Sequence, residues 1–329
     1  MDAVRWGVLG VAGIAVRAVM PAIQRSQNGR LVAIASRVAA KAEEAARRTG
    51  IARAHGSYEA LLNDPDVQAV YIPLPNSLHR EWTIRCAEAG KHVLCEKPLA
   101  LSPAQCDEMI AACTQHRVVL MEAFMYRFHP RTVEVERMAR RGALGEIRLV
   151  RAGLASLVLN PQDRISFRPD LGGGTLYDVG CYTVDVSRMV LGEPDEVFAY
   201  GRIGEYGVDE QAGAVLRFPK GQVALIDCSL KLPRRQEYEI VGTDARVTVP
   251  HAFGPGTADT EFVLTKGTEQ TVHPIPGADQ SLLMVEHVSH AIRSGAPVRL
   301  RAEDSARNLR VITALRASLQ TGRPQPVSN

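Results

Sequence analysis

Residues 5–37, RWGVLGVAGIAVRAVMPAIQRSQNGRLVAIASR, contain the pattern that decides the fold of this chain. Residues 5–9 are a short apolar run typical of a strand, residues 14–27 have the composition of a helix, and residues 31–35 form a second apolar run. A strand, a turn, a helix and a further strand in this order make a βαβ unit, whose two strands are parallel. The stretch therefore predicts a parallel sheet at the start of the chain.

The same alternation continues to about residue 122. Further apolar runs predict strands at residues 69–72, 92–95 and 118–121, with helices between them at 77–89 and 103–116. The second helix has a clear start signal, because Ser102 is a favourable N-cap, Pro103 suits the first helical position and Gln105 completes a capping box. Strands that alternate with helices of this length imply a doubly wound α/β domain with both faces of its sheet covered.

The second half of the chain has a different period. Alternating runs predict the strands of an antiparallel sheet at residues 147–157, 196–203, 211–218, 223–230, 237–241 and 246–249. Helices are predicted at residues 130–141, 175–191, 281–294 and 303–320, and the tail beyond them is expected to fray. We therefore expect two domains, an α/β domain of residues 1–122 and a domain of residues 123–329 built on an open, mainly antiparallel sheet.

Composition and charge argue against several classes of protein. The 329 residues include 39 Lys and Arg against 36 Asp and Glu, a net charge of +3, which gives no strong field for nucleic acid or an anionic membrane. We find no apolar window of membrane-spanning length and no signal-peptide pattern, so we expect a cytoplasmic protein. The six cysteines form no CxxC pair and no cluster with histidines, so we expect buried, reduced thiols and no metal site.

The turn after the first predicted strand has the position of a dinucleotide-binding loop, where pyrophosphate meets a helix N-terminus. Gly10 suits the tight turn, while Ala12 and Ala15 replace the second and third glycines of the usual pattern. A methyl group at the second position still lets the backbone approach a phosphate, although less closely. By itself the loop is equally compatible with an ordinary strand-to-helix turn. The cofactor contacts predicted here are Gly10, Ala12, Gly13 and Ile14.

The end of the second predicted strand indicates which nucleotide binds. An acidic residue at this point usually holds the ribose of NAD, but this chain has Ser36 and Arg37, a hydroxyl and a guanidinium suited to a phosphate. The pair favours NADP, with NAD as the alternative cofactor. The competing interpretation is that Arg37 is only a solvated loop residue.

Residues 90–99, GKHVLCEKPL, place a lysine at the end of a strand. Pro98 cannot donate to a sheet, so it ends the strand and stiffens the backbone beside Lys97. This carboxyl edge is where α/β sheets bind ligands. A lysine beside an alcohol stabilises the developing alkoxide. The alternative is a lysine exposed on a surface loop.

Three glycines, residues 172–174, precede a predicted helix that carries Asp178 and Tyr182. Glycines allow the backbone to pass close to a ligand, and a spacing of four places the two side chains on one face. A carboxylate and a phenol together can bind and deprotonate a hydroxyl group, and Lys97 is the candidate that lowers the phenol pKa from about 10. The alternative is a core Tyr182 whose hydroxyl is bound by Asp178.

Four motifs in a fixed order give the chain a specific resemblance. They are residues 73–79 PLPNSLH, 96–98 EKP, 121–130 MEAFMYRFHP and 172–182 GGGTLYDVGCY. Together they resemble the glucose-fructose oxidoreductase and inositol dehydrogenase family, Gfo/Idh/MocA, over essentially the whole chain. The resemblance implies a Rossmann domain followed by an open antiparallel sheet, a nicotinamide cofactor, and oxidation or reduction of a sugar, polyol or dihydrodiol.

The resemblance also implies roles for individual residues. It places Lys97 beside the nicotinamide and makes Tyr182 the proton donor or acceptor, as in the tyrosine-bearing branches of the family, with Asp178 as the third catalytic residue. Implied cofactor contacts are Pro73, Leu74, Asn76, His79, Glu96 and Lys97. Implied substrate contacts are Lys97, Arg127, His129, Arg164, Asp178 and Tyr182. Asp185, which falls near the same helical face, is expected only to cap or pair.

The predicted function is therefore hydride transfer between NADP and a hydroxyl-bearing carbon of a sugar, polyol or related diol, with Tyr182 moving the hydroxyl proton. Three alternatives remain open: a nucleotide-sugar 3-ketoreductase, an oxidoreductase that never releases its nucleotide, and a non-catalytic NADP-binding sensor or scaffold. The resemblance also implies a homodimer or homotetramer that forms through the uncovered face of the open sheet.

Overall fold

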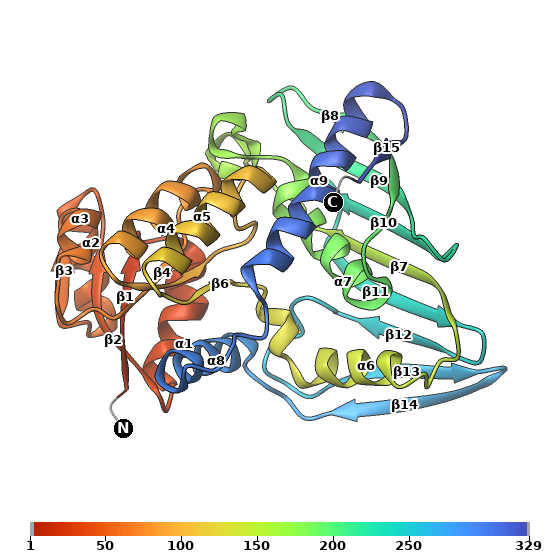
Figure 1. The fold of residues 1–329 in the computed structure, drawn as a ribbon, viewed down its shortest axis with the longest axis horizontal. Coiled ribbons are helices and arrows are strands. Elements are labelled where there is room, and N and C mark those ends of the chain that lie inside the picture. Colours follow the sequence, from red (N-terminus) through yellow and green to blue (C-terminus); the bar gives the residue numbers. More distant parts are fainter. Residues whose placement is uncertain (1–2, 328–329) are drawn as a thin grey trace. The chain divides into compact units, whose positions relative to one another are not determined.

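A parallel sheet organises the first of two units into which the chain folds (Figure 1). The computed structural model describes residues 3–327, and within them this unit comprises residues 3–125 and 279–306. The six strands found there are β1 (Val4–Leu9), β2 (Gly29–Ala35), β3 (Arg53–His55), β4 (Ala69–Ile72), β5 (His92–Cys95) and β6 (Leu120–Glu122). Their order, β3-β2-β1-β4-β5-β6, is that of a Rossmann sheet, whose ligands bind at the carboxyl ends of β1 and β4, where the strand order reverses.

Helices follow the strands of this unit, and the sequence predicts those within residues 14–27, 77–89 and 103–116 but not those at residues 39–49 and 58–62. The helices are η1 (Ala15–Val19), α1 (Met20–Arg25), α2 (Ala39–Thr49), α3 (Tyr58–Leu62), η2 (Asn76–Leu78), α4 (His79–Glu88) and α5 (Pro103–Gln115). The capping box at the start of α5 is confirmed: Ser102 Oγ accepts from the Gln105 N–H at 3.3 Å, and Gln105 Oε1 accepts from the Leu101 N–H at 3.0 Å. All six cysteines of the chain lie within the described residues and are buried free thiols.

One helix from late in the sequence packs within this unit. Helix α8 (Gln280–Ser294) lies beside α1 in Figure 1 and buries Met284, Val285 and Val288. Trp6 Nε1 donates to Ser289 Oγ at 3.0 Å, which ties α8 to β1. The sequence prediction divided the chain once, after residue 122, whereas the structure returns residues 279–306 to the first unit. The reason is that the apolar stripe of α8 finds its partner on α1 and β1.

The second unit, residues 126–278 and 307–327, contains the larger sheet. Its nine strands within the described residues are β7 (Ile147–Ala155), β8 (Glu196–Ile203), β9 (Asp209–Arg217), β10 (Val223–Ser229), β11 (Arg235–Gly242), β12 (Arg246–Pro250), β13 (Thr260–Lys266), β14 (Glu269–Ile275) and β15 (Gln325–Pro326). The order is β14-β13-β12-β11-β7-β10-β9-β8-β15, and among these described strands only β7 and β10 are parallel neighbours. The predicted open, mainly antiparallel sheet is confirmed. The tail does not simply fray, because β15 pairs with β8.

Helices lie on one face of this sheet (Figure 1). They include α6 (Pro130–Arg140), α7 (Cys181–Leu191) and α9 (Ala302–Thr321), with short turns η3 (Met125–Phe128), η4 (Pro161–Asp163), η5 (Ile165–Phe167), η6 (Pro169–Leu171) and η7 (Leu176–Gly180) elsewhere. Helix α7 packs on β7 and β10, and Ser318 of α9 accepts a hydrogen bond from the Ala199 N–H of β8 at 2.9 Å. The sheet thereby has a covered face with a continuous core.

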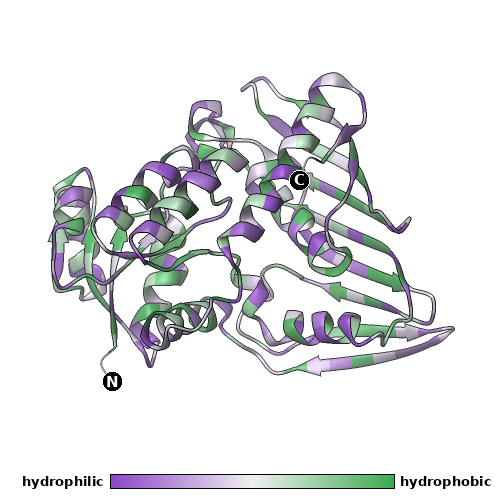
Figure 2. Ribbon diagram, viewed as in Figure 1, coloured by the Kyte–Doolittle hydropathy of each residue, from purple (hydrophilic) through white to green (hydrophobic). Residues whose placement is uncertain are grey.

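The opposite face of the sheet carries exposed apolar side chains. Phe198 of β8 pairs with Val215 of β9, which in turn pairs with Leu225 of β10, and each of the three is about two-fifths exposed. Hydrophobic and hydrophilic residues alternate along these strands (Figure 2). This row of Phe198, Val215 and Leu225 crosses three neighbouring strands and forms one continuous apolar surface.

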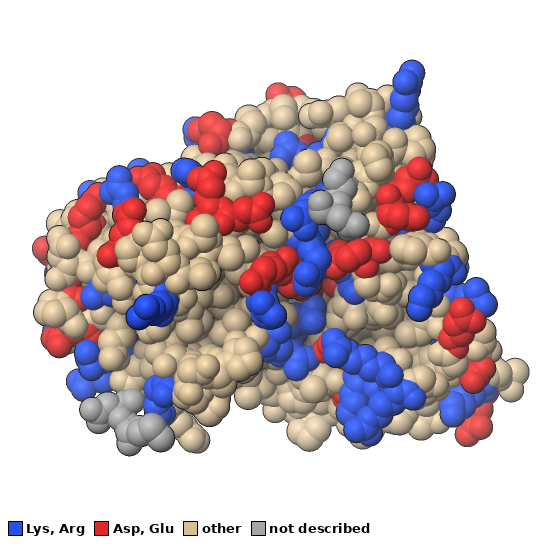
Figure 3. Space-filling model, in the orientation of Figure 1, with Lys and Arg blue, Asp and Glu red and all other residues tan. Residues whose placement is uncertain are grey.

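Charged side chains of both signs are interspersed on the face of the molecule drawn in Figure 3. Figure 3 shows Lys and Arg among Asp and Glu, with one group of basic side chains over α6. Two basic residues of that helix are paired, Arg137 with Glu134 and Arg140 with Glu136. Within residues 3–327, no helix has the length and apolar character needed to cross a membrane.

Candidate active site

The turn after β1 is shaped by close contacts that only glycine permits. Gly10 has φ of +94°, a conformation that side-chain-bearing residues rarely adopt, and its N–H donates to the Ala35 carbonyl at 2.8 Å. A methyl group on Gly10 would lie 3.0 Å from Leu74 Cδ2 and 3.5 Å from the Tyr58 hydroxyl. The structure thus brings together Gly10 and Leu74, two predicted cofactor contacts from the ends of β1 and β4.

The rest of this loop is open to solvent. Gly13 and Ile14 are exposed, Ile14 by 40%, and Ala12 is half-buried. The helix that follows begins with the π-helical turn η1, a widened turn that occurs frequently at functional sites. An exposed loop that leads from a buried parallel strand into a helix is compatible with the predicted contact to a pyrophosphate.

The end of β2 is fixed by hydrogen bonds of Ser36. Its N–H donates to the His55 carbonyl at 3.1 Å, and its Oγ accepts from the Val38 N–H at 3.2 Å. The neighbouring Arg37 is exposed and bonds to the buried Tyr58 phenol. Burial raises the pKa of Tyr58, and the charge and hydrogen bond of Arg37 partly oppose this shift. Arg37 is therefore tethered by Tyr58 at the end of β2, and its contact with a 2′-phosphate stays a prediction.

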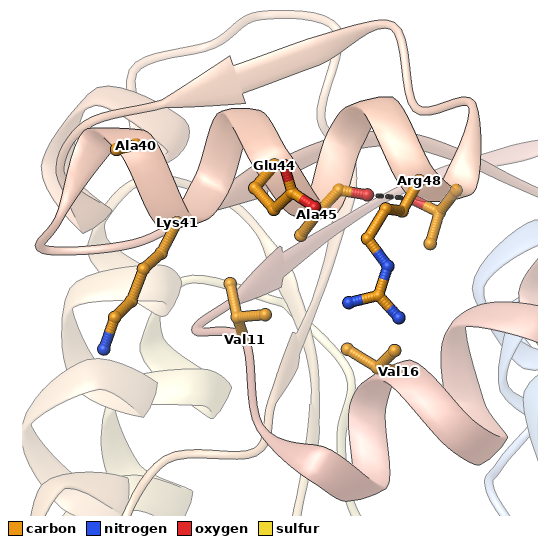
Figure 4. Close-up of a pocket in the computed structure, with 8 residues that line it drawn as sticks. Val11, Val16, Ala40, Lys41, Glu44, Ala45 and Arg48 are labelled. Atoms are coloured by element: carbon orange, nitrogen blue, oxygen red, sulfur yellow. Dashed lines mark hydrogen bonds between the residues drawn. The ribbon is translucent and has the colours of Figure 1, made fainter.

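A pocket of about 450 Å³ lies between α2 and the loop after β1 (Figure 4). Lys41 and Arg48 extend from α2 toward it, and Val11 and Val16 approach from the loop and η1. The pocket is lined by Val11, Val16, Ala40, Lys41, Glu44, Ala45, Arg48 and Thr49. None of these residues was predicted as a site residue, because a groove between two helices leaves no local signature in the sequence.

Lys97 lies at the carboxyl end of β5, half-buried, and its bond to Pro98 is cis. Two carboxylates fix the backbone around it. Glu96 accepts from the Tyr71 hydroxyl at 2.5 Å and from the Lys97 N–H at 3.3 Å. The buried Glu122 accepts from the Leu99 N–H at 2.8 Å. The segment that carries the lysine is therefore anchored on both sides.

His79 is fully buried and joins two of the sequence motifs. Its Nδ1 lies 2.9 Å from the Pro98 carbonyl oxygen, and its Nε2 lies 2.8 Å from the Leu74 carbonyl oxygen. Burial lowers the pKa of His79, and the charge of Lys97 lowers it further, although the carbonyls act in the opposite direction. The sequence prediction made His79 a cofactor contact. In the structure both ring nitrogens face backbone carbonyls, and because a neutral imidazole has a single N–H, one of the two contacts is a hydrogen bond that holds these loops. Asn76 lies half-buried in η2.

In the second unit, Asp178 and Tyr182 lie where η7 passes into α7. Asp178 is half-buried in the π-helical turn, and Tyr182 is 6% exposed in α7. The Tyr182 ring packs against Tyr126, with centroids 5.8 Å apart, and against Phe253, with centroids 5.4 Å apart. The aromatic cluster of Tyr126, Tyr182 and Phe253 therefore fixes the ring that carries the predicted catalytic hydroxyl.

Two of the three glycines before η7, Gly173 and Gly174, are required by packing within the chain. A methyl group on Gly173 would lie 2.7 Å from the Ser166 carbonyl oxygen, and one on Gly174, at φ of +124°, would overlap the Asp209 carboxylate. Asp209 is buried and accepts from the Leu176 N–H at 2.7 Å, so it caps the start of the helix. The sequence prediction gave these glycines a close approach to a ligand. In the structure, glycine is needed at Gly173 and Gly174 because neighbouring segments of the chain itself pass too close for a side chain.

Asp185 is the centre of a buried network. It accepts from the Tyr126 hydroxyl and from Arg127, whose Nη1 lies 3.1 Å from both carboxylate oxygens. Arg127 Nη2 also lies 3.8 Å from Glu136. Burial lowers the pKa of Arg127, but Asp185, Tyr126 and Glu136 together outweigh burial and raise the pKa overall. Arg127 was predicted to contact substrate. Its guanidinium instead forms a buried ion pair that supports the aromatic cluster.

His129 is buried at the N-terminus of α6, where its Nδ1 accepts from the Arg131 N–H at 3.1 Å. Burial and the charge of Arg131 lower the pKa of His129 to about 4, so the imidazole is neutral at pH 7. Because Nδ1 is an acceptor, Nε2 carries the proton, and this Nε2–H has no partner among the described residues. Arg164 lies exposed between η4 and η5, and Asp163 beside it is also exposed.

Both halves of the chain match models of one family. Residues 4–124 match the oxidoreductase family with an NAD-binding Rossmann fold, GFO_IDH_MocA, and residues 132–248 match the GFO/IDH/MocA C-terminal domain. The chain belongs to the Gfo/Idh/MocA oxidoreductase family. The resemblance drawn from four sequence motifs is thereby confirmed.

Relatives and solved structures agree with this assignment. The chain is 40% identical over 321 residues to D-xylose 1-dehydrogenase (NADP(+)) 2 of Haloferax volcanii, which covers 96% of this chain and 98% of the relative. It is 33% identical over 280 residues to trans-1,2-dihydrobenzene-1,2-diol dehydrogenase of Xenopus laevis, covering 81% of this chain and 83% of the relative. The fold matches KijD10, a 3-ketoreductase from Actinomadura kijaniata in complex with NADP and TDP-benzene, with a TM-score of 0.91, 32% identity, and coverage of 97% and 98%.

Proposed function

We propose that this Gfo/Idh/MocA protein is an NADP-dependent oxidoreductase that interconverts a hydroxyl-bearing carbon and a carbonyl in a sugar, polyol or related diol. The observation that carries the cofactor choice is the end of β2, where Ser36 and Arg37 stand in place of a carboxylate that would bind the ribose of NAD. The named relatives include an NADP-dependent sugar dehydrogenase and a diol dehydrogenase. NAD is the weaker alternative cofactor.

The residues of the first unit fit a dinucleotide. Gly10 has the positive φ that the tight turn after β1 needs, with no room for a side chain against Leu74, and the exposed residues after it would present backbone N–H groups to a phosphate. Arg37 would pair with the 2′-phosphate, and the segment of Pro73, Leu74 and Asn76 would line the nicotinamide end. When bound, the nicotinamide supplies the hydride acceptor or donor. Glu96 and His79 hold the loops on which Leu74 and Lys97 are carried.

The protein's own groups supply the proton chemistry. Tyr182 would take the hydroxyl proton during oxidation and return it during reduction, with its ring position fixed by Tyr126 and Phe253. Lys97 would stabilise the negative charge that develops on the reacting oxygen. Asp178 would accept a hydrogen bond from the substrate and so orient it.

Substrate contacts are proposed for Asp178, Tyr182, Lys97, His129 and Arg164. The argument for His129 is its buried, unpartnered Nε2–H, because a buried donor left without an acceptor costs about 1–3 kcal/mol. A substrate oxygen would satisfy it. Arg127 is left out of this set because its guanidinium forms buried ion pairs with Asp185 and Glu136.

A screen of sugars, polyols and diols with NADP and with NAD, followed at the nicotinamide absorbance, tests the proposed function. With the best substrate, Tyr182→Phe should lower kcat by about 10²–10⁴-fold and leave the dissociation constant of NADP within about twofold. Tyr200→Phe, at a position that is 79% exposed on β8, is the matched control and should have no effect. Unchanged turnover in Tyr182→Phe would remove the proton-transfer role.

A second candidate is a nucleotide-sugar 3-ketoreductase that works in the reducing direction. The observation in its favour is the TM-score of 0.91 to the 3-ketoreductase KijD10. Oxidation of NADPH with a keto-sugar nucleotide, and no reaction with free sugars, would select this candidate. A sensor that binds NADP without turnover is disfavoured because Lys97, Asp178 and Tyr182 are all present.

We further propose that the protein is cytoplasmic and forms a homodimer or homotetramer through the open face of the larger sheet. The supporting observation is the apolar row of Phe198, Val215 and Leu225, since uncovered apolar surface of this kind usually meets a partner. Val215→Glu should shift the sedimentation coefficient to that of a monomer. Val133→Glu, a control at a 38% exposed site on the helix α6, should leave assembly intact. A monomeric wild type would refute the assembly.

A further inference from the structure

We propose that Tyr58 is a positioning residue for NADP selection: its phenol holds the Arg37 side chain beside the Gly10 turn, where it would meet the 2′-phosphate. The inference rests on the proposed use of NADP and adds a residue to that site. No sequence motif pointed to Tyr58, which lies between the two segments that would contact the nucleotide.

Tyr58 lies between the glycine loop and the end of β2. It is the first residue of α3, after the N-cap Ser57, and is 6% exposed. Its hydroxyl lies 3.5 Å from the position of a methyl group on Gly10 and is hydrogen-bonded to Arg37. The phenol oxygen therefore lies beside the turn that would face the pyrophosphate and is bonded to the side chain that would face the 2′-phosphate.

The phenol oxygen is held in place by a chain of contacts behind the ring. Trp82 of α4 packs edge-on to Tyr58, with centroids 4.8 Å apart and ring planes at 84°. Arg85 lies over the Trp82 ring at 4.8 Å. The same guanidinium pairs with Glu59 at 3.0 Å and with Glu81 at 2.8 Å. Helices α3 and α4 are thereby joined around the Tyr58 ring, so its hydroxyl is a fixed point.

A fixed hydrogen-bond acceptor restricts the conformations of the Arg37 side chain before a phosphate binds. Arg37 is exposed, and a long exposed side chain loses rotamer freedom when it binds a ligand. A guanidinium has five N–H donors, so a bond to the phenol leaves others for the phosphate. Tyr58 would therefore reduce the entropy lost on NADP binding. NAD lacks the 2′-phosphate and would gain nothing from this arrangement.

The test measures dissociation constants of NADP and NAD for the full chain by isothermal titration calorimetry. Tyr58→Phe keeps the ring packing on Trp82 and removes the hydroxyl. It should weaken NADP binding about fivefold, the effect of one hydrogen bond, and leave NAD binding within about twofold. Tyr177→Phe is the matched control, because Tyr177 also contacts an arginine, Arg316, and does so in the second unit. It should leave the ratio of the two constants unchanged.

A double-mutant cycle separates positioning from general support of the fold. In an Arg37→Ala background, Tyr58→Phe should cause no further loss of NADP affinity, because its effect passes through Arg37. A full fivefold loss in that background, or equal losses for NADP and NAD in the single variant, would overturn the inference. If Arg37→Ala itself leaves the ratio unchanged, the proposed NADP preference fails instead. For a variant that is less stable, the inhibition constants of 2′,5′-ADP and 5′-AMP as competitors of the cofactor can be compared instead. They differ in the same 2′-phosphate that distinguishes NADP from NAD.

Discussion

Lowering the pH from 7 to 4 should destabilise the protein through His129 by about 3 kcal/mol. The folded pKa of about 4 lies below the ordinary value of 6.5 that the unfolded chain would have. Between these two values the unfolded state binds more protons than the folded state, so stability falls as the pH falls. The contribution is fully present above the unfolded pKa and is lost as the pH drops toward 4.

The size of the effect follows from the two pKa values. Their difference is about 2.5, which corresponds to a limit of about 3.4 kcal/mol well below pH 4. Relative to pH 7, the same linkage relation gives a loss of about 1.8 kcal/mol at pH 5 and about 2.8 kcal/mol at pH 4. The physical source is the His129 environment, where the Arg131 N–H already occupies Nδ1 and the imidazole is buried.

The assay compares the wild type with His129→Asn by urea unfolding at a series of pH values. Asparagine can still accept the Arg131 N–H as an N-cap and does not titrate, so other titrating groups cancel in the difference. That difference should change by about 3 kcal/mol between pH 7 and pH 4. A flat difference would refute the reasoning, as would an NMR titration that places the folded pKa of His129 near 6.5.

Three further predictions concern single side chains. Arg127→Met should destabilise the fold by about 3–5 kcal/mol in urea unfolding because Asp185 loses its buried partner; a raised KM with unchanged stability would restore the substrate-contact interpretation. Gly174→Ala should cost at least about 1–3 kcal/mol in the same assay, through strain at positive φ and overlap with Asp209, and wild-type stability would contradict this. Lys97→Met should lower kcat by at least about 100-fold with NADP affinity kept, as measured by single-turnover kinetics and calorimetry; an equal loss in both would make Lys97 a cofactor anchor only.

The fold was largely predictable because each half of the chain has its own hydrophobic period. Buried parallel strands appear as short apolar runs, and half-buried antiparallel strands appear as alternating runs. Strands β3, β13, β14 and β15 were not predicted. Most side chains of β14 are exposed, so it has no alternation to detect. The sequence also could not predict that α8 packs in the first unit. Its apolar stripe predicts a helix but does not say which unit will cover it.

The candidate site was predictable in its motifs but not in the role of each residue. Arg127 and Asp185 lie 58 positions apart in sequence, and only the fold reveals that they form a buried pair. His79 looks the same in sequence whether its nitrogens face a ligand or two carbonyls. Charge and residue type indicate that a group is important, whereas its burial and partners determine what it does.

Most polar residues in the recognisable motifs hold other groups in place. Glu96, Glu122 and His79 fix the segment around Lys97. Arg127 and Asp185 support Tyr126, on which the Tyr182 ring packs. These residues serve the reaction of any substrate equally, so they carry little information about which sugar or diol is used. We therefore expect selectivity for the substrate to depend strongly on positions outside the motifs, such as Arg164 in the exposed segment before η5. Exchange of that segment between relatives should change the preferred substrate while the cofactor preference stays with Arg37.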